Sequence, residues 1–199
     1  MLRRGGERLE HEREGKKYEG TPYVPAEHIE GALITAAKEF KQGARASYMQ
    51  FAKACFFVVQ REISFNGNAH EWIIDERPVV INRARVLAWR PRWDKWELDF
   101  TLRCTQPLKI DDKTVEEILE HAGWFVGIGD FRPKYGRYEV VKCEAKDQPK
   151  DQKYRDYEVT LRGIVPLLHH KFTSKTGTKK KKVYNHAEEA IAGLYLKPD

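Results

Sequence analysis

The clearest alternation of hydrophobic and polar positions in this chain lies between Trp96 and Cys104. Every second residue there is apolar, and the residues between them are charged or carry a hydroxyl group. Side chains of a strand point alternately to its two faces, so this pattern predicts a strand with one buried face. The expected buried set is Trp96, Leu98, Phe100, Leu102 and Cys104.

Other stretches also have strand-like patterns, with polar segments between them. A short extended piece, Thr21–Val24, comes first. The turn at Arg90–Lys95 is expected to return the chain antiparallel to the strand that starts at Trp96. The further predicted strands are Cys55–Phe65, Val79–Trp89, Arg137–Cys143 and Glu158–Leu168, with a polar loop at Asn66–Pro78.

Apolar positions three and four residues apart predict helices. The first is expected over Pro25–Gly43, because proline suits a first helical turn and glycine a helix end. The second is capped by Asp111 or Asp112 and ends at Gly123 or slightly later. A capping box starts a last helix within Asn185–Leu194.

The order of these elements indicates an α+β chain. It reads helix, strand, hairpin, helix, strand, linker, strand, helix, whereas a ferredoxin-like (RRM-like) fold reads strand, helix, strand, strand, helix, strand. The strand at Glu158–Leu168 has the pattern of a core strand and comes late. We therefore expect a ferredoxin-like antiparallel sheet with two helices, in which this late strand takes the missing first place. It does so in its own subunit, as a circular permutation, or in a neighbour, as a strand swap.

The expected organisation is one domain with appendages, which suits a chain of 199 residues with 41% hydrophobic content. Residues 1–20 are predicted to form a flexible N-terminal arm, and residues 21–143 the ferredoxin-like core. A linker follows at 144–156. Residues 157–199 supply a strand, a basic loop and a helix that complete the core or swap to a neighbour.

The formal net charge of +6 favours an anionic partner. No stretch approaches the roughly 20 apolar residues of a membrane span, and the start of the chain lacks the apolar core of a signal peptide. We therefore expect no membrane partner and a cytoplasmic location. Cys55, Cys104 and Cys143 are an odd number of cysteines, far apart, and suggest buried thiols in a reducing compartment.

A glycine-rich segment follows the second predicted helix and carries three cations. Glycine leaves backbone N–H groups uncovered, and concavities lined by such groups bind anions. The segment therefore predicts a phosphate-binding turn; the alternative is that its glycines only permit a tight turn. The residues concerned are Gly127, Gly129, Arg132, Lys134, Gly136 and Arg137.

Cations and aromatic rings alternate between Arg83 and Trp96, a composition that suits single-stranded nucleic acid. The alternative is that the tryptophans fill the core and the arginines pair with Glu97 and Asp99. We expect Trp96 in the core and Trp93 exposed at the turn. The proposed contacts are Arg83, Arg85, Arg90, Arg92, Trp93 and Lys95, and a second basic run, Lys179, Lys180, Lys181 and Lys182, could follow a phosphate backbone.

His28 is the best candidate for acid–base chemistry, with Tyr23 and Lys38 as companions. Metal-independent RNA cleavage needs a base for the 2′-hydroxyl proton and an acid for the leaving oxygen, and a histidine at a helix start suits such a role. The alternative is an inert surface histidine. No P-loop, dinucleotide fingerprint, nucleophile elbow or zinc spacing occurs, so we expect no cofactor and no metal.

Two segments resemble motifs of the CRISPR-associated RAMP superfamily. Tyr23–Leu33 is similar to its helix start, and Gly127–Tyr138 to its glycine-rich loop. Tyr157–Phe172 also looks like the opening strand of uncharacterised phage-type proteins that share both motifs, which agrees with a permutation. The resemblance implies RRM-like folds that bind CRISPR RNA, as repeated backbone subunits or as repeat-cleaving nucleases.

The sequence thus predicts a protein that binds single-stranded RNA, or single-stranded DNA, and forms homo-oligomers or joins a larger complex of CRISPR or phage type. One alternative is a metal-independent endoribonuclease that uses His28. Another is a self-assembling structural or phage-complex subunit in which the late strand docks into a neighbour.

Overall fold

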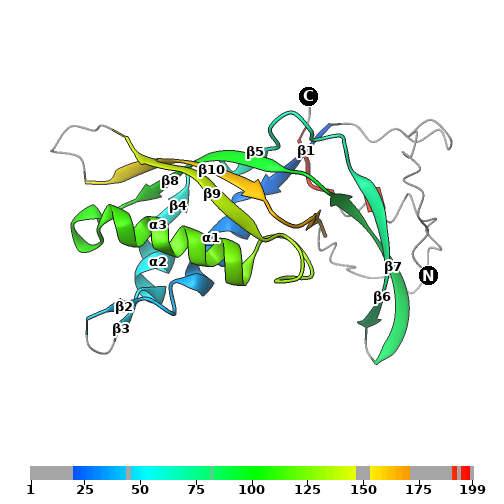
Figure 1. Ribbon diagram of the computed structural model, residues 1–199, viewed down its shortest axis with the longest axis horizontal. Helices are drawn as coiled ribbons and strands as arrows, with labels where there is room; N and C mark the ends of the chain where they lie inside the picture. Colours follow the sequence, from blue (N-terminus) through cyan, green and yellow to red (C-terminus); the bar gives the residue numbers. More distant parts are fainter. Residues whose placement is uncertain are drawn as a thin grey trace, which may run out of the picture.

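The structure is a computed structural model that describes residues 20–43, 46–81, 83–146, 153–170, 190–191 and 194–197. The fold is mixed α+β with antiparallel sheets (Figure 1). The elements are β1 (Thr21–Pro25), α1 (Ala26–Ala36), β2 (Lys41–Gln42), β3 (Ala46–Ser47), α2 (Met49–Cys55), β4 (Phe56–Val58), β5 (Glu62–Ser64), β6 (Ile73–Ile81), β7 (Ala84–Trp93), β8 (Glu97–Cys104), η1 (Pro107–Lys109), α3 (Asp112–His121), η2 (Ala122–Val126), β9 (Tyr138–Ala145), β10 (Arg155–Gly163), β11 (Leu167–Leu168) and β12 (Leu196–Lys197).

The main sheet has four strands in the order β4-β8-β10-β9, and each neighbouring pair is antiparallel. Helices α1, α2 and α3 lie together on one face of this sheet (Figure 1). The core fills the space between the two layers. The alternation predicted around β8 is confirmed, because its apolar set, with Trp96 just before it, is almost fully buried.

The late strand completes the sheet of its own chain. β10 lies between β8 and β9, from Arg155 opposite Cys104 to Arg162 opposite Glu97. It begins before the predicted start and ends at Gly163, where the chain passes against the indole of Trp96. Trp96 Nε1 donates to the Val165 carbonyl at 2.9 Å. Of the two expected arrangements, the structure has the strand within its own subunit.

The β6–β7 hairpin extends away from the helices and the main sheet (Figure 1). Its strands pair from Ile73 opposite Arg92 to Ile81 opposite Ala84, and β11 adds a third strand to β7. The expected strand at 79–89 and turn at 90–95 are therefore wrong. The chain turns next to Arg83, whose φ of 67° is left-handed. Hairpin turns are usually recognised in a sequence by glycine, and this turn has none, so the sequence pattern did not indicate its position.

Residues 55–65, predicted as one strand, form two short strands in the structure. Residue 55 ends α2, a helix that the hydrophobic pattern did not indicate, and β4 and β5 follow in different sheets. β4 pairs with β8, whereas β5 pairs with β1, which in turn pairs with β12. The carbonyl of Arg61, between the two short strands, accepts a hydrogen bond from the backbone N–H of Ala26 (3.0 Å) and so holds the start of α1.

Helix α1 ends at Ala36 and not near Gly43. Helix α3 agrees with its prediction, and the Asp111 side chain caps it by accepting from the Thr114 N–H at 2.7 Å. The predicted arm, the basic run Lys179–Lys182 and the start of the last helix lie outside the described residues. The segment between β9 and β10 is shorter than the linker expected at 144–156, because β9 continues to Ala145 and β10 starts at Arg155.

We expect Gly163→Ala to lower the free energy of unfolding by about 1–3 kcal/mol, the usual range for overpacking. A Cβ at this position would lie 2.2 Å from Trp96 Nε1, and the buried indole has no room to retreat. Urea unfolding measures the change. Gly31→Ala is the matched control, since a Cβ there has nothing within 4 Å and helix propensity should add about 0.5–1 kcal/mol. Equal stabilities of the two variants would contradict the packing argument.

Candidate nucleic-acid interface

The segment Gly127–Arg137, called the glycine loop below, connects η2 to β9 and folds back on itself. The Ile128 N–H donates to the Gly136 carbonyl at 2.9 Å, and the Asp130 N–H donates to the Leu168 carbonyl at 2.8 Å. The loop therefore rests on β11. The absence of a Cβ permits this, because a Cβ on Gly136 (φ 71°) would lie 1.8 Å from the Ile128 carbonyl oxygen.

The expected phosphate-binding role of these backbone groups needs a correction. The Gly127 N–H donates to the Ala122 carbonyl (2.7 Å), and the Gly136 N–H donates to the Pro166 carbonyl (2.8 Å). These two groups point into the protein and are not available to a ligand. The tight-turn interpretation accounts for both glycines, and for Gly129, whose added Cβ would lie 2.4 Å from the Leu168 carbonyl oxygen.

The tip of the loop, Phe131–Lys134, is exposed to solvent. Arg132 and Lys134 are on this open surface, and neither forms an ion pair with any residue that the structure describes. Arg137 is half-buried at the loop's exit, with its Nε inside the protein. Two of the three predicted loop cations therefore face solvent fully.

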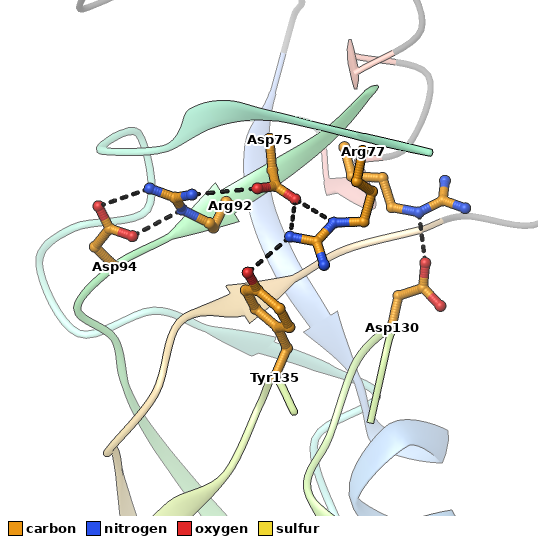
Figure 2. Close-up of polar contacts among 7 residues, drawn as sticks. Asp75, Arg77, Arg92, Asp94, Asp130 and Tyr135 are labelled. Carbon is orange, nitrogen blue, oxygen red and sulfur yellow. Dashed lines mark hydrogen bonds and ion pairs between the residues drawn. The ribbon is translucent and has the colours of Figure 1, made fainter. Parts of the chain in front are cut away.

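Figure 2 shows how the hairpin holds the loop. The Arg77 guanidinium lies 4.7 Å from the ring centre of Phe131 and 4.4 Å from that of Tyr135, and it donates to the Tyr135 hydroxyl at 2.7 Å. The Arg77 Nε also donates to Asp75 at 2.5 Å. A second link joins Arg90 to Asp130 at 2.5 Å. These contacts fix the loop tip relative to β6 and β7.

The same ion pairs remove part of the predicted hairpin site. Arg92 bridges Asp75 (3.2 Å) and Asp94 (2.8 Å), and Arg90 is held by Asp130. The arginines thus pair with carboxylates, though not with the expected Glu97 and Asp99. Arg83 and Arg85 are exposed near the hairpin turn, and Lys95 is exposed between β7 and β8, so the predicted set does not form one surface.

Trp93 is buried, contrary to the expectation that it is exposed. Its side chain has no exposed area, its ring stacks on Phe65 at 4.6 Å, and its Nε1 donates to the Ala69 carbonyl at 3.0 Å. The prediction failed because it placed Trp93 in a turn, whereas it is the last residue of β7. Trp96 is buried as expected.

A groove of about 470 Å³ lies beside the loop tip. Phe125 and Phe131 line it and are 68% and 40% exposed, and the adjacent Trp124 is 52% exposed. The sequence reasoning did not single out these aromatic residues. The sequence did contain a sign of their exposure. Trp124 and Phe125 come after the last apolar position that α3 needs for its buried face, so the core does not account for them. The groove is lined by Thr35, Phe125, Val126, Gly129, Asp130, Phe131, Arg132 and Pro133.

A second recess, of about 450 Å³, lies at the start of α1 and contains two of the three predicted catalytic residues. Tyr23 and His28 both line it, and the rings of His28 and Tyr195 are 5.4 Å apart. Lys38 lies beyond the other end of α1 and does not line this recess. The grouping inferred from sequence thus holds for Tyr23 and His28 in space, but not for Lys38.

Burial lowers the pKa of His28, and the positive charge of Arg132 lowers this pKa further. Glu27 and Asp130 oppose the change. His28 is therefore a neutral imidazole near neutral pH, and its buried Nδ1 has no hydrogen-bond partner in the part of the chain that the structure describes. The recess and the groove at the loop tip both lie along α1, since Glu27 and His28 line the first and Thr35 lines the second.

His169 lies behind His28, fully buried, with ring centres 6.1 Å apart. Neither ring nitrogen has a hydrogen-bond partner among the described residues, and Trp93, Phe65 and Tyr195 lie around the ring. Burial lowers its pKa to about 3. Its neighbour His170 instead contacts Arg90 at 2.8 Å, so the two adjacent histidines face different surroundings.

The open face of the main sheet offers little to a nucleic acid. Its outward residues include Glu97, Asp99 and Glu158, and the cations among them are ion-paired. Arg162 contacts Glu97 at 3.1 Å, and Lys142 contacts Glu158 at 3.2 Å. The cations on this face are thus engaged by carboxylates, whereas Arg132 and Lys134 at the loop tip are among the exposed cations that form no ion pair with a described residue.

Comparisons with known protein families, curated proteins and solved structures found no match to this chain. Within the described ranges, no group of three or more His, Cys, Asp or Glu side chains could hold a metal ion. Over those ranges there is also no helix with the length and apolar character that a bilayer crossing requires.

We expect acid to destabilise the fold through His169. The folded protein keeps this imidazole neutral down to a pH of about 3, while the unfolded chain takes up a proton near pH 6.5. The stabilising contribution is complete above pH 6.5 and is lost as the pH falls, by up to about 1.4 kcal/mol per pH unit. Urea unfolding between about pH 4.5 and 7 measures this slope. His169→Phe, which keeps an aromatic ring without a titrating group, should flatten it, and an unchanged slope would rule out this role.

Proposed function

We propose that this protein binds single-stranded RNA, with single-stranded DNA as the alternative ligand, through the tip of the glycine loop. The observation that carries the proposal is the pair of exposed cations Arg132 and Lys134, which form no ion pair with a described residue and lie on a tip that Arg77 and Arg90 hold in place. Preorganised cations bind phosphates without first having to break ion pairs. The net charge of +6 favours the same kind of ligand.

We further propose that the domain is a circularly permuted ferredoxin-like fold. When β10 is counted first, the main elements run β10, α1, β4, β8, α3, β9, which is the ferredoxin-like order. In the sheet, β8 separates β10 from β4, and β10 separates β8 from β9, as two split strand–helix–strand units require. The β6–β7 hairpin is then an insertion between β4 and β8.

The RAMP-like character of the chain is part of this proposal. The segment that resembles the RAMP helix start forms most of β1 and most of α1, and Thr35 near the end of α1 lines one groove together with residues of the segment that resembles the glycine-rich loop. The charge of Arg132 acts on His28, one residue from each segment. A subunit of a CRISPR or phage-related ribonucleoprotein, which self-associates or binds other subunits, is the assembly that this resemblance favours.

The test is a double variant, Arg132→Ala with Lys134→Ala. We expect its affinity for a single-stranded oligonucleotide to fall on the order of tenfold at low salt, because two phosphate contacts are lost. The slope of log affinity against log salt should become shallower by about 1.4, or roughly 0.7 for each contact on a single strand. Fluorescence anisotropy with labelled RNA and DNA of one sequence measures both quantities.

The matched control is Lys142→Ala with Arg162→Ala, which removes the same charge from the outer face of the sheet. Both side chains are already ion-paired there, with Glu158 and Glu97. Their loss should leave affinity and salt slope close to the original. If both double variants bind as the unchanged protein does, the loop tip is not the binding site.

A second candidate is a metal-independent endoribonuclease centred on His28. The specific observation is that Tyr23 and His28 share a recess next to the charge of Arg132. A neutral imidazole can accept the 2′-hydroxyl proton, and a guanidinium can stabilise charge on the phosphate. Cleavage of labelled RNA in EDTA that is lost in His28→Ala would establish this activity. RNA that stays intact with the unchanged protein would reject it.

A further inference from the structure

We infer that the groove beside the loop tip holds an unpaired nucleobase, stacked against Phe125 and Phe131, while Arg132 binds the neighbouring phosphate. This inference rests on the proposed function and names the part of the ligand that the groove recognises. It makes the groove a site for single-stranded rather than double-stranded nucleic acid, because a paired base is not free to leave its stack.

The first argument is the composition of the groove. It combines the rings of Phe125 and Phe131 with the guanidinium of Arg132, and its volume of about 470 Å³ falls within the range of small-molecule sites, about 300–1,000 Å³. Proteins that bind single-stranded nucleic acids commonly combine aromatic side chains with a neighbouring cation. The rings stack on bases of any identity, and the cation meets the backbone.

The second argument is the exposure of the aromatic side chains. Trp124, Phe125 and Phe131 leave much of their surface in water, although each could contribute to a core. The π-helical turn η2 shifts Trp124 and Phe125 away from the buried stripe of α3. Such turns occur often at functional sites, and clustered exposed apolar surface is characteristic of binding sites.

The third argument is that the Phe131 ring is held in advance. Its backbone has a left-handed φ of 59°, an unfavourable conformation for a residue with a side chain. Arg77 stacks on the ring, and Tyr135 meets it edge-on with ring centres 6.3 Å apart. The ring also lines the groove, so a base that enters meets a surface that needs no reordering.

The experiment compares two ligands of equal length, a single-stranded oligonucleotide and the same sugar-phosphate backbone without bases. Phe125→Ala should weaken binding of the oligonucleotide on the order of tenfold and leave binding of the abasic strand unchanged. Phe125→Tyr, which keeps a ring, should bind as the unchanged protein does. Phe125 is largely exposed, so its replacement should not unfold the domain, and urea unfolding checks this.

The controls separate this inference from the function on which it rests. Leu108→Ala removes another exposed apolar side chain, one that does not line the groove, and should change neither affinity. The double variant of Arg132 and Lys134 should weaken both ligands. Equal loss for both ligands in Phe125→Ala, or no loss for either, overturns the stacking site while the phosphate contacts stand. If the unchanged protein binds neither ligand, both the function and the stacking site are rejected.

Discussion

The antiparallel pairing of β8 with β10 is the constraint on which the rest of the structure depends. It joins a strand from the middle of the chain to one from its last third, and it places Leu98 and Leu161 opposite each other beneath the helices. The end of β10 then leads to Pro166 and Leu168, whose carbonyls accept the N–H groups of the glycine loop. This register therefore positions the base of the loop, while contacts with the hairpin position its tip.

On the side of the β6–β7 hairpin, a buried carboxylate helps to position the loop. Asp75 is only 7% exposed and contacts both Arg77 and Arg92. A buried charge is costly unless it is paired, and removal of one partner leaves the other uncompensated. We therefore interpret Asp75 as a residue that specifies where Arg77 lies, and through Arg77 where Phe131 and Tyr135 lie. Its net contribution to stability is a separate matter, because desolvation offsets the attraction.

The distribution of paired and unpaired charge decides where an anionic ligand can bind. On the sheet face and at the hairpin base, cations such as Arg162, Arg90 and Arg92 are engaged by carboxylates. At the loop tip, Arg132 and Lys134 have no ion-pair partner among the described residues. An anion that approaches the tip gains attraction without breaking an existing pair. Exposed aromatic rings, those of Phe125 and Phe131, line the groove beside the same tip.

The sequence by itself determined the elements whose signal is local. The alternation along β8 and the cap and stripe of α3 each follow from the pleat or the helical turn, and both predictions were confirmed. The late strand was recognisable as a core strand for the same reason. The loop cations were also visible as a cluster, since they are neighbours in the chain.

Only the tertiary structure decided which of these residues are available. Trp96 was expected in the core and lies there, but Trp93, expected at a turn, is also buried because the hairpin turns next to Arg83 instead. Arg90 and Arg132 both lie in stretches that look polar in sequence, but Arg90 contacts Asp130 and His170, whereas Arg132 is exposed. Ion pairs and burial depend on residues distant in the chain, so no local pattern encodes them. The exposure of Phe125 likewise depends on the direction in which η2 continues from α3, and the packing of distant residues determines that direction.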